Sequence, residues 1–356
     1  MSPKKYYAEL SDESLLDPQV RTQDNPKVGV LLVNLGTPSS PTTKDIRRYL
    51  AEFLSDQRVV EIPPIFWQII LRGFVLPFRP KKLVPKYESI WLEQGSPLAV
   101  YSQAQADLLQ DQIQAQGWDV PVRLAMRYGQ PAMHDVLNEL TALGCERILM
   151  LPLYPQYAAS TTATAVDELN RYVAKRRNQP ETRAVKSYCQ HPGYIQPLVQ
   201  SIERHWQTEA KPQRLLLSFH GVPRRTIVAG DPYYRECMLT TAAVRAALAH
   251  HEVPVYASFQ SRFGAERWLE PYTEPTLRQW AKEGVESVHV ACPGFLADCL
   301  ETLEEIQMEC QEAFIEDGGK HFAYIPCLND DKAWVSGLCD IVLQNLSGWE
   351  LPKNAN

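Results

Sequence analysis

The chain has no hydrophobic run that is long enough to cross a membrane. Its most apolar stretch, residues 65–76, is interrupted by Gln68 and Arg72 and is too short for a membrane span. Residues 1–26 are polar and contain no apolar segment of the kind that signal peptides carry. We therefore expect a flexible N-terminal arm on a cytoplasmic protein.

Several familiar motifs are also missing. The sequence contains no GxGxxG, no Walker loop, no HExxH and no GxSxG pattern, so nucleotide binding and hydrolysis by a serine triad lose their usual support. None of the eight cysteines forms a CxxC pair, which favours reduced, buried thiols over a disulfide framework or a zinc or iron–sulfur site. A formal net charge of −6 argues against nucleic acid as a partner.

A basic cluster follows the apolar stretch 65–76. It consists of Arg79, Lys81, Lys82 and Lys86. An apolar face beside basic side chains suits peripheral contact with an anionic lipid surface, here the inner membrane. It equally suits a lid that packs on its own domain, and both interpretations stay open.

Three short patterns occur twice, in the same order in each half of the chain. They are an apolar run leading to Gly-x-Pro, a Pro-Val pair leading to Arg-aromatic-Gly, and a Gly-led apolar run ending in proline. The matching pairs are residues 28–38 and 214–223, 121–129 and 254–264, and 144–152 and 284–293. Three matches in one order indicate two related lobes.

Helix-period stretches alternate with these strand-like runs, at residues 104–116, 131–143, 239–250 and 274–282. This alternation predicts an α/β fold with two similar Rossmann-like lobes, parallel sheets and a cleft between them. We place the first lobe at 27–190, with a lip insertion at 51–98, and the second at 191–329. Residues 330–356 hold a C-terminal helix that braces the first lobe and has no counterpart in the repeat.

His220 ends the apolar run of the second lobe, directly before Gly221. Ligands of open parallel sheets bind at the carboxyl ends of strands, so this imidazole is a candidate proton acceptor or metal ligand. A structural histidine that hydrogen-bonds a nearby loop is the alternative.

Three carboxylates at intervals of four begin about eighty residues later, at Glu301, Glu305 and Glu309. An ideal helix rotates such residues by about 40° per step, whereas a widened π-type turn would bring them closer to one line. Two alternatives compete. Asp298 and Glu301 match a capping box, and the row could be a solvated acidic face.

Four segments together resemble the ferrochelatase family, whose members insert ferrous iron into protoporphyrin. They are Leu31–Pro38, Leu153–Tyr157, Ser218–Pro223 and Asp298–Leu303. The resemblance spans residues 27–329. It implies two Rossmann-like lobes around a porphyrin cleft, with protoporphyrin IX and Fe²⁺ as substrates and protohaem as the product.

The matching motifs imply which residues of this chain form the family's site. His220 and Glu301 take the catalytic and metal-binding positions, with the two roles not yet divided between them, and Glu305 and Glu309 form a path for metal or protons. The resemblance, and for all but Leu35 the polar or aromatic character of the side chain, mark the following porphyrin-binding candidates: Leu35, Ser96, Arg127, Tyr128, Tyr157, Trp268 and Phe295.

Two departures from the family pattern matter. Cys299 stands where many members have histidine, and Ala159 stands where animal members place a cysteine of their cluster. The C-terminal cysteine motif of those members is also absent, so we expect no [2Fe–2S] centre and no cofactor beyond the substrate iron. A chelatase for cobalt or nickel, a haem-binding protein, a bilobed binding protein and a hydrolase built on His220 remain as rival functions.

Overall fold

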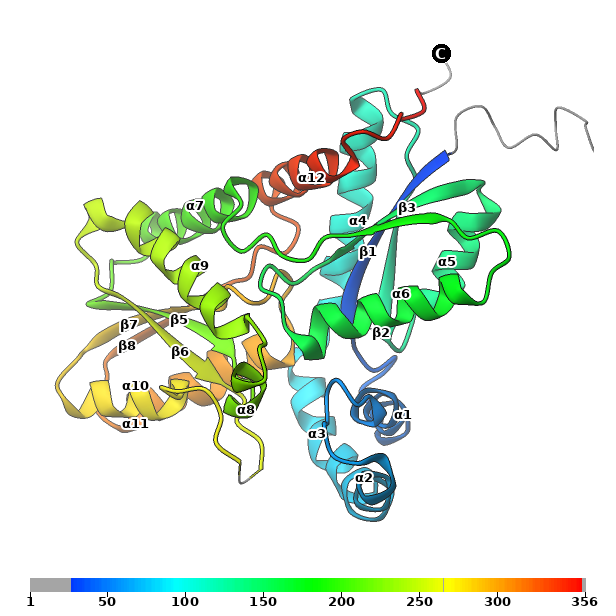
Figure 1. Cartoon of the computed structure of the whole chain (residues 1–356). Coiled ribbons are helices and arrows are strands. Elements are labelled where there is room, and N and C mark those ends of the chain that lie inside the picture. Colours follow the sequence, from blue (N-terminus) through cyan, green and yellow to red (C-terminus); the bar gives the residue numbers. More distant parts are fainter. Residues whose placement is uncertain (1–26, 265, 354–356) are drawn as a thin grey trace, which may run out of the picture.

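The chain folds into two lobes that each contain a four-stranded parallel sheet, as the repeat predicts (Figure 1). The computed structural model describes residues 27–264 and 266–353, so the predicted arm at 1–26 lies outside the described residues. The first sheet has the order β2-β1-β3-β4. Its strands are β1 (Lys27–Gly36), β2 (Val122–Tyr128), β3 (Cys145–Pro152) and β4 (Glu181–Ala184).

The second sheet repeats this order as β6-β5-β7-β8. Its strands are β5 (Arg214–His220), β6 (Val255–Gln260), β7 (Ser287–Ala291) and β8 (His321–Ile325). The central strands β1 and β5 are almost continuously buried and apolar, because helices cover both faces of a parallel sheet.

Helices connect the strands of each lobe. In the first lobe they are α4 (Pro97–Ala115), α5 (Met133–Ala142), η3 (Ala159–Ala163) and α6 (Thr164–Ala174). In the second lobe they are α8 (Arg224–Val228), α9 (Tyr233–Ala247), η4 (Ala249–His251), α10 (Thr273–Lys282), η5 (Leu300–Cys310) and α11 (Gln311–Glu316). A π-helix follows the third strand of both lobes, η3 in the first and η5 in the second. The duplication therefore extends beyond the strands.

The lip insertion consists of helices α1 (Thr43–Ser55), α2 (Pro64–Ile70), η2 (Leu71–Val75) and α3 (Leu76–Ile90). It begins earlier than predicted, because Thr42 caps α1 by accepting a hydrogen bond from the Asp45 amide at 3.4 Å. Its helices form a core of their own beside β2 and lie at one end of the molecule (Figure 1).

Two long helices cross at the other end, α7 (Pro192–Thr208) and α12 (Lys332–Leu346) (Figure 1). Each follows the fourth strand of its lobe, so α7 is the counterpart of α12 that the sequence analysis missed. They approach closely at Gly193 and Gly337, where a Cβ on Gly337 would lie 1.8 Å from the Gly193 carbonyl oxygen. Helix α12 packs on α4 of the first lobe, and α7 packs on α9 of the second.

One hydrophobic cluster runs through both lobes. It contains Leu32 of β1, Phe219 of β5 and the fully buried Trp334 of α12. The two sheets therefore share an interior, and burial of the large side chains in it stabilises the lobes against each other by roughly 1.5–3 kcal/mol for each side chain.

Candidate active site

His220 is the last residue of β5, and its ring is oriented by the chain that follows it. Its Nδ1 lies 2.7 Å from the Gly221 carbonyl oxygen, which can only accept a hydrogen bond. Nδ1 therefore carries the proton, and Nε2 presents a lone pair. The Tyr233 hydroxyl donates to the His220 carbonyl oxygen at 2.9 Å and holds the strand end in place.

Two aromatic side chains flank this imidazole. The rings of Trp268 and Phe295 each have their centres 6.4 Å from that of His220. Gly221 makes the close approach possible, because a Cβ there would lie 3.2 Å from the Trp268 ring and 2.8 Å from the Gln260 carbonyl oxygen. The Trp268 Nε1 is buried without a partner in the described part of the chain, so this indole keeps an unused donor beside His220.

Glu301 lies in the first turn of η5, the π-helix that the four-residue spacing suggested. The capping-box alternative for Glu301 is wrong. The N-cap is Cys299, whose backbone N–H donates to the Thr302 hydroxyl at 2.9 Å, and Asp298 instead accepts hydrogen bonds from Tyr324 and Asn329. The Glu301 carboxylate is thus not used to satisfy the helix start.

The carboxyl end of β6 positions the carboxylate-bearing helix. Gln260 lies beside His220 in the sheet and donates its Nε2 to the Glu301 carbonyl oxygen at 2.6 Å. The next residue, Ser261, donates its amide and hydroxyl to the Glu305 carboxylate at 2.7 and 2.5 Å. Ser261 has a φ of 65°, a left-handed conformation that costs about 1–2 kcal/mol in a residue with a Cβ.

His220, Glu301 and Glu305 form one electrostatic group. Burial raises the pKa of the Glu305 carboxyl above its ordinary value, and the charge of Glu301 raises it further. The Ser261 hydrogen bonds, and His220 once it holds a second proton, act in the opposite direction without cancelling that rise. A carboxyl with a raised pKa exchanges protons near neutral pH more readily than an exposed one.

The outer part of the acidic row has a different environment. Glu309 is about half exposed, and its carboxylate contacts Lys86 Nζ of α3 at 2.6 Å. Glu304, which the sequence analysis did not single out, contacts the same amine at 2.8 Å. Lys86 therefore joins the lip to η5 and is not free for lipid headgroups, which corrects its assignment to the basic cluster.

The lip supplies further neighbours of Glu301. Burial raises the pKa of the Tyr49 and Tyr87 hydroxyls, and the nearby Glu301 charge adds to both shifts. Burial lowers the pKa of Arg79, while Tyr87 and Glu301 favour its charged form. Arg79 also stacks on the Phe263 ring at 4.7 Å, so it reaches across to the second lobe. Because these contacts come from distant segments, no local pattern in the sequence indicates them.

Comparison with protein families and known sequences decides the relationship. The ferrochelatase family model matches residues 27–346. The chain is 52% identical over 347 residues to a protein named ferrochelatase from Bordetella parapertussis, covering 98% of this chain and 96% of the relative. It is 53% identical over 323 residues to one from Methylibium petroleiphilum, covering 91% and 89%. This chain belongs to the ferrochelatase family.

Solved chelatase structures share the fold of this ferrochelatase-family chain. SirB from Bacillus subtilis with Fe³⁺ superposes with a TM-score of 0.54 at 13% identity, covering 90% of this chain and 96% of that one. The sirohydrochlorin chelatase SirB from Bacillus subtilis subspecies spizizenii, in complex with cobalt, gives 0.52 at 13% identity, covering 89% and 94%. These likenesses confirm the two-lobed chelatase fold.

The porphyrin-binding candidates inferred from the ferrochelatase family fall into separate groups. Trp268 and Phe295 lie beside His220. Leu35, at the end of β1, packs in the lip core together with Trp91 and with Leu300, the residue before Glu301. Trp268 and Phe295 therefore lie at the candidate proton acceptor, and Leu35 lies in the lip core that Leu300 also contacts.

Arg127 and Tyr128 belong to a polar network at the base of the lip. Arg127 Nη2 and the Tyr128 hydroxyl bond the Asp56 carboxylate at 2.6 and 2.9 Å, and Thr164 donates to it at 2.5 Å. Burial opposes the Asp56 charge, but hydrogen bonds from Thr164, the Arg58 amide and Tyr128, together with the Arg127 charge, lower its pKa overall. Arg127 and Tyr128 also line a cavity of about 820 Å³ whose lining in the described chain includes neither His220 nor Glu301.

Ser96 and Tyr157 make their contacts elsewhere. The buried Ser96 hydroxyl caps α4 by accepting from the Ala99 amide at 3.3 Å. The Tyr157 amide donates to Glu236 at 2.7 Å, and its ring faces the Lys186 amine at 5.2 Å. The structure therefore gives both residues a local bonding role and does not bring them to His220.

Proposed function

We propose that this chain inserts ferrous iron into protoporphyrin IX to form protohaem, the last step of haem synthesis, with His220 and Glu301 at the reacting centre. Membership of the ferrochelatase family supports this activity and a metal-chelating lyase as the enzyme class. The structural observation that supports it best is the grouping of the His220 lone pair with Glu301, Glu305 and two aromatic rings.

The reaction releases two pyrrole N–H protons as Fe²⁺ binds the four nitrogens. We assign the proton acceptor to His220, because the Gly221 carbonyl fixes its tautomer with a free Nε2. Glu305 suits the onward transfer of these protons, since burial raises its pKa and it interacts with both His220 and Glu301. No redox step is required, because iron is ferrous in both substrate and product.

Glu301 is assigned to the incoming metal. Its carboxylate does not bind a backbone amide of the helix start but interacts with the Cys299 thiol, and its backbone is held by Gln260. Carboxylate oxygens bind divalent iron and exchange it readily. Glu309 at the exposed end of the row marks the entry of the proposed metal path, where Lys86 compensates the negative charge before metal arrives.

The macrocycle would lie between the second lobe and the lip. Trp268 and Phe295 supply one apolar wall, and Leu35 with Trp91 supplies the other. Flat apolar side chains of this kind bury a porphyrin face and exclude water from the metal site.

The deciding experiment mixes the purified protein with protoporphyrin IX and Fe²⁺ without oxygen and follows the visible spectrum. Conversion of the free-porphyrin bands to those of haem, at a rate proportional to protein concentration, supports the proposal. Cobalt and nickel in place of iron compare the rival metals. A protein that binds finished haem but leaves free porphyrin unmetallated would instead be a haem carrier.

We also propose that no iron–sulfur cluster is needed. All eight cysteines are free thiols, and burial raises the pKa of Cys299 and Cys292 well above the ordinary value, which disfavours the thiolates that bind clusters. Iron and sulfide analysis of the protein purified without oxygen tests this. Stoichiometric acid-labile sulfide would contradict it.

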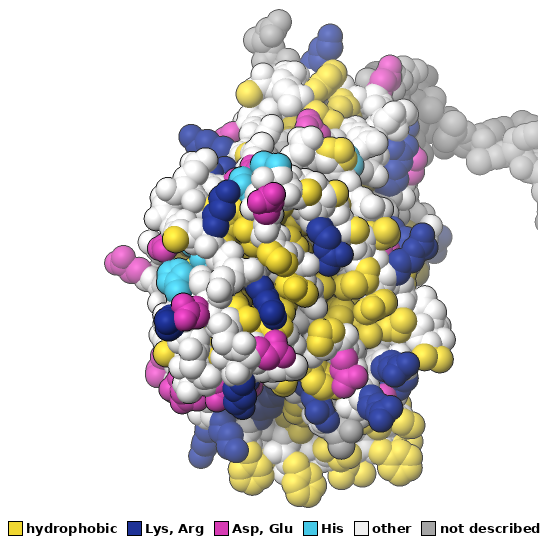
Figure 2. All heavy atoms as spheres, turned by 90° about the vertical axis from the view of Figure 1, so that its left-hand side faces the viewer, with side chains coloured by type: hydrophobic (Ala, Val, Ile, Leu, Met, Phe, Trp, Pro, Cys, Tyr) yellow, Lys and Arg dark blue, Asp and Glu magenta, His cyan; other side chains and the backbone are white. Residues whose placement is uncertain are grey.

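Peripheral membrane contact through the lip is the third part of the proposal. No helix in the described chain is long and apolar enough to span a membrane. The lip, however, exposes a group of large apolar side chains, which form the yellow surface at the lower end of Figure 2. These lip residues are Ile62, Ile65, Phe66, Ile69, Ile70, Phe74 and Phe78. So large an apolar surface is typical of a membrane or protein contact.

A further inference from the structure

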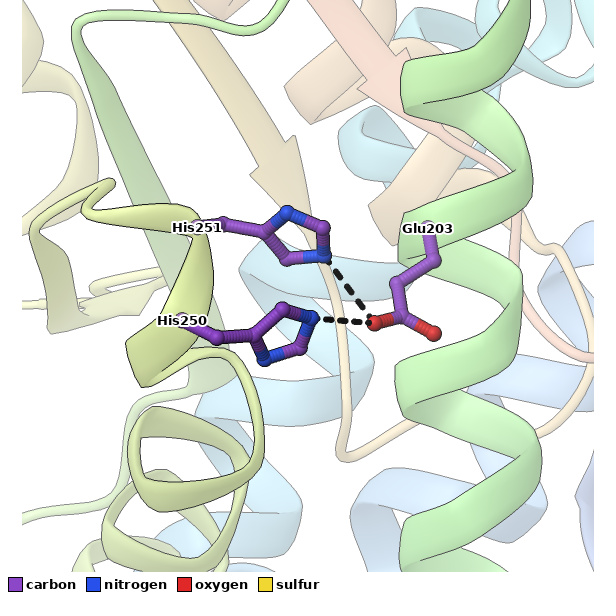
Figure 3. Close-up of side chains that lie close together, drawn as sticks. All are labelled: Glu203, His250 and His251. Atoms are coloured by element: carbon purple, nitrogen blue, oxygen red, sulfur yellow. Dashed lines mark hydrogen bonds and ion pairs between the residues drawn. The ribbon is translucent and has the colours of Figure 1, made fainter.

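Three metal-ligating side chains meet on the second lobe, away from the site described above. Glu203 comes from α7, and His250 and His251 come from the 3₁₀ turn η4, and all three point toward one another (Figure 3). Their ligand atoms all lie within 4.8 Å of one another. Among residues 27–264 and 266–353, no other set of three or more His, Cys, Asp or Glu side chains meets this criterion.

The spacing of the ligand atoms suits one small divalent ion. The Nε2 atoms of His251 and His250 lie 3.0 and 3.4 Å from the Glu203 Oε1. Ligand atoms bonded to a tetrahedral ion at about 2.0–2.1 Å stand roughly 3.3 Å apart, so only small side-chain shifts are needed. The two imidazole rings are 4.0 Å apart at their centres, which brings both nitrogens to the same side of the carboxylate.

The backbone orients one ligand in the way that metal sites require. His250 Nδ1 lies 3.0 Å from the Ala247 carbonyl oxygen, so Nδ1 carries the proton of the neutral ring. In that tautomer Nε2 faces the Glu203 carboxylate oxygen at 3.4 Å with its lone pair available to a metal ion. A carbonyl behind a ligating histidine is the usual outer support of a metal site.

Trp206, on the same helix as Glu203, also contacts His251. The Trp206 ring meets the His251 ring edge-on at 5.1 Å, and its Nε1 donates to the buried His289 at 3.1 Å. The ligand helix, the turn and the sheet are thereby fixed relative to each other. Since η4 precedes β6, the group lies at the amino end of the sheet, whereas His220 lies at the carboxyl end.

We propose that Glu203, His250 and His251 form a second metal site, separate from the porphyrin reaction, that binds a divalent transition ion of the Zn²⁺ type. Two imidazole nitrogens and one carboxylate oxygen are the donors such ions prefer, and the three leave further coordination positions open to water. Binding would fasten η4 to α7, two elements that are far apart in the sequence.

The test measures Zn²⁺ binding to the full chain by equilibrium dialysis in a Glu301→Gln background, which weakens metal binding at the porphyrin site. We expect one Zn²⁺ per chain, lost on adding Glu203→Gln or His250→Gln. His134→Gln is the matched control, because His134 is an exposed histidine with only one carboxylate, Asp135, beside it at 3.7 Å. Each variant is first shown to be folded by its circular dichroism in EDTA.

A second readout follows the thermal midpoint. Zn²⁺ should raise the midpoint of the Glu301→Gln protein by about 2–4 °C, and it should not do so when Glu203→Gln is added. The proposal is overturned if Glu203→Gln and His250→Gln leave the Zn²⁺ stoichiometry, the Zn²⁺ affinity and the midpoint shift unchanged. Loss of Zn²⁺ binding in His134→Gln to the same extent would overturn it as well, because it would show non-specific surface binding.

Discussion

Gln260 joins the end of strand β6 to Glu301 through a hydrogen bond of 2.6 Å from its Nε2 to the Glu301 carbonyl oxygen. Its Oε1 accepts from the Ser218 hydroxyl at 2.7 Å, so the amide itself cannot rotate freely. Gln260 pairs with His220 in the sheet. The buried Gln260 side chain therefore fixes η5, the helix that carries Glu301, relative to His220.

Replacing Gln260 by alanine should disturb this relationship. The buried Glu301 carbonyl would lose its donor, which costs about 1–3 kcal/mol in the free energy of unfolding. Because Glu301 would move relative to His220, we expect kcat for metallation to fall about tenfold while KM for porphyrin stays nearly constant. Gln279→Ala on the exposed face of α10 is the control. An unchanged kcat in Gln260→Ala would remove Gln260 as a positioning residue.

His220→Ala tests the proposed proton acceptor. Loss of general-base help should lower the anaerobic metallation rate about a hundredfold or more. Folding should be retained, because the Tyr233 hydroxyl bonds the backbone of His220 and not its ring. Circular dichroism and the rate with His134→Ala serve as controls. Near-normal turnover of the alanine variant would assign the proton to another group.

The fold was largely predictable because the strand-like runs are apolar and repeated. Several elements were missed, two of them for clear physical reasons. β4 is a short strand of polar residues, Glu181–Ala184, with no apolar run, since it forms the edge of its sheet. α7 could not be paired with α12 from the sequence, because the two helices correspond in their position after the fourth strand of each lobe and not in a shared sequence pattern.

His220 and Glu301 could be singled out from the sequence, because the residues themselves carry a pattern, and their role stays a prediction. Gln260 and Ser261 were missed, although the carboxyl end of β6 beside a candidate strand could have indicated them. Lys86 could not be assigned from the sequence. Its partners Glu304 and Glu309 are more than two hundred residues away, and only the packing of α3 against η5 brings them together.

The acidic row should respond differently at its two ends. Glu305→Gln removes a carboxyl that interacts with both His220 and Glu301, and we expect the apparent KM for Fe²⁺ to rise about tenfold with porphyrin affinity little changed. Glu309→Gln removes only an exposed ion pair with Lys86, which contributes about 0–1 kcal/mol. Iron-dependent initial rates at fixed porphyrin compare the two. Equal kinetics for both variants and the unaltered protein would favour a purely solvated acidic face.

His289 should make the stability of the protein depend on pH. The side chain is fully buried, and burial lowers its pKa to about 3, with His205 and His321 adding to the shift. The unfolded chain, with a histidine pKa of about 6.5, binds a proton in this range that the folded chain does not. Stability is therefore complete above about pH 6.5 and falls as the pH drops toward 3.

This dependence can be isolated with one substitution. Between pH 7 and pH 5 the unaltered protein should lose about 2 kcal/mol more unfolding free energy than His289→Gln, whose amide oxygen can still accept from Trp206. Guanidinium unfolding at the two pH values measures the difference. Parallel losses in both proteins would show that His289 does not contribute to the pH dependence.

The exposed apolar face of the lip should control attachment to membranes. Phe66 and Phe74 are 66% and 67% exposed, so replacing both by aspartate removes little packing within the protein. A side chain contributes about 1.5–3 kcal/mol when it moves fully from water into an apolar phase. Even partial insertion of two rings therefore predicts at least about tenfold weaker binding to vesicles with anionic headgroups.

Co-sedimentation measures this, with Ile315→Asp on α11 as the control for an exposed apolar residue outside the lip. If the double variant and Ile315→Asp both bind vesicles as the unaltered protein does, the apolar face does not bind membranes. It would then serve a protein partner or the entry and exit of the macrocycle.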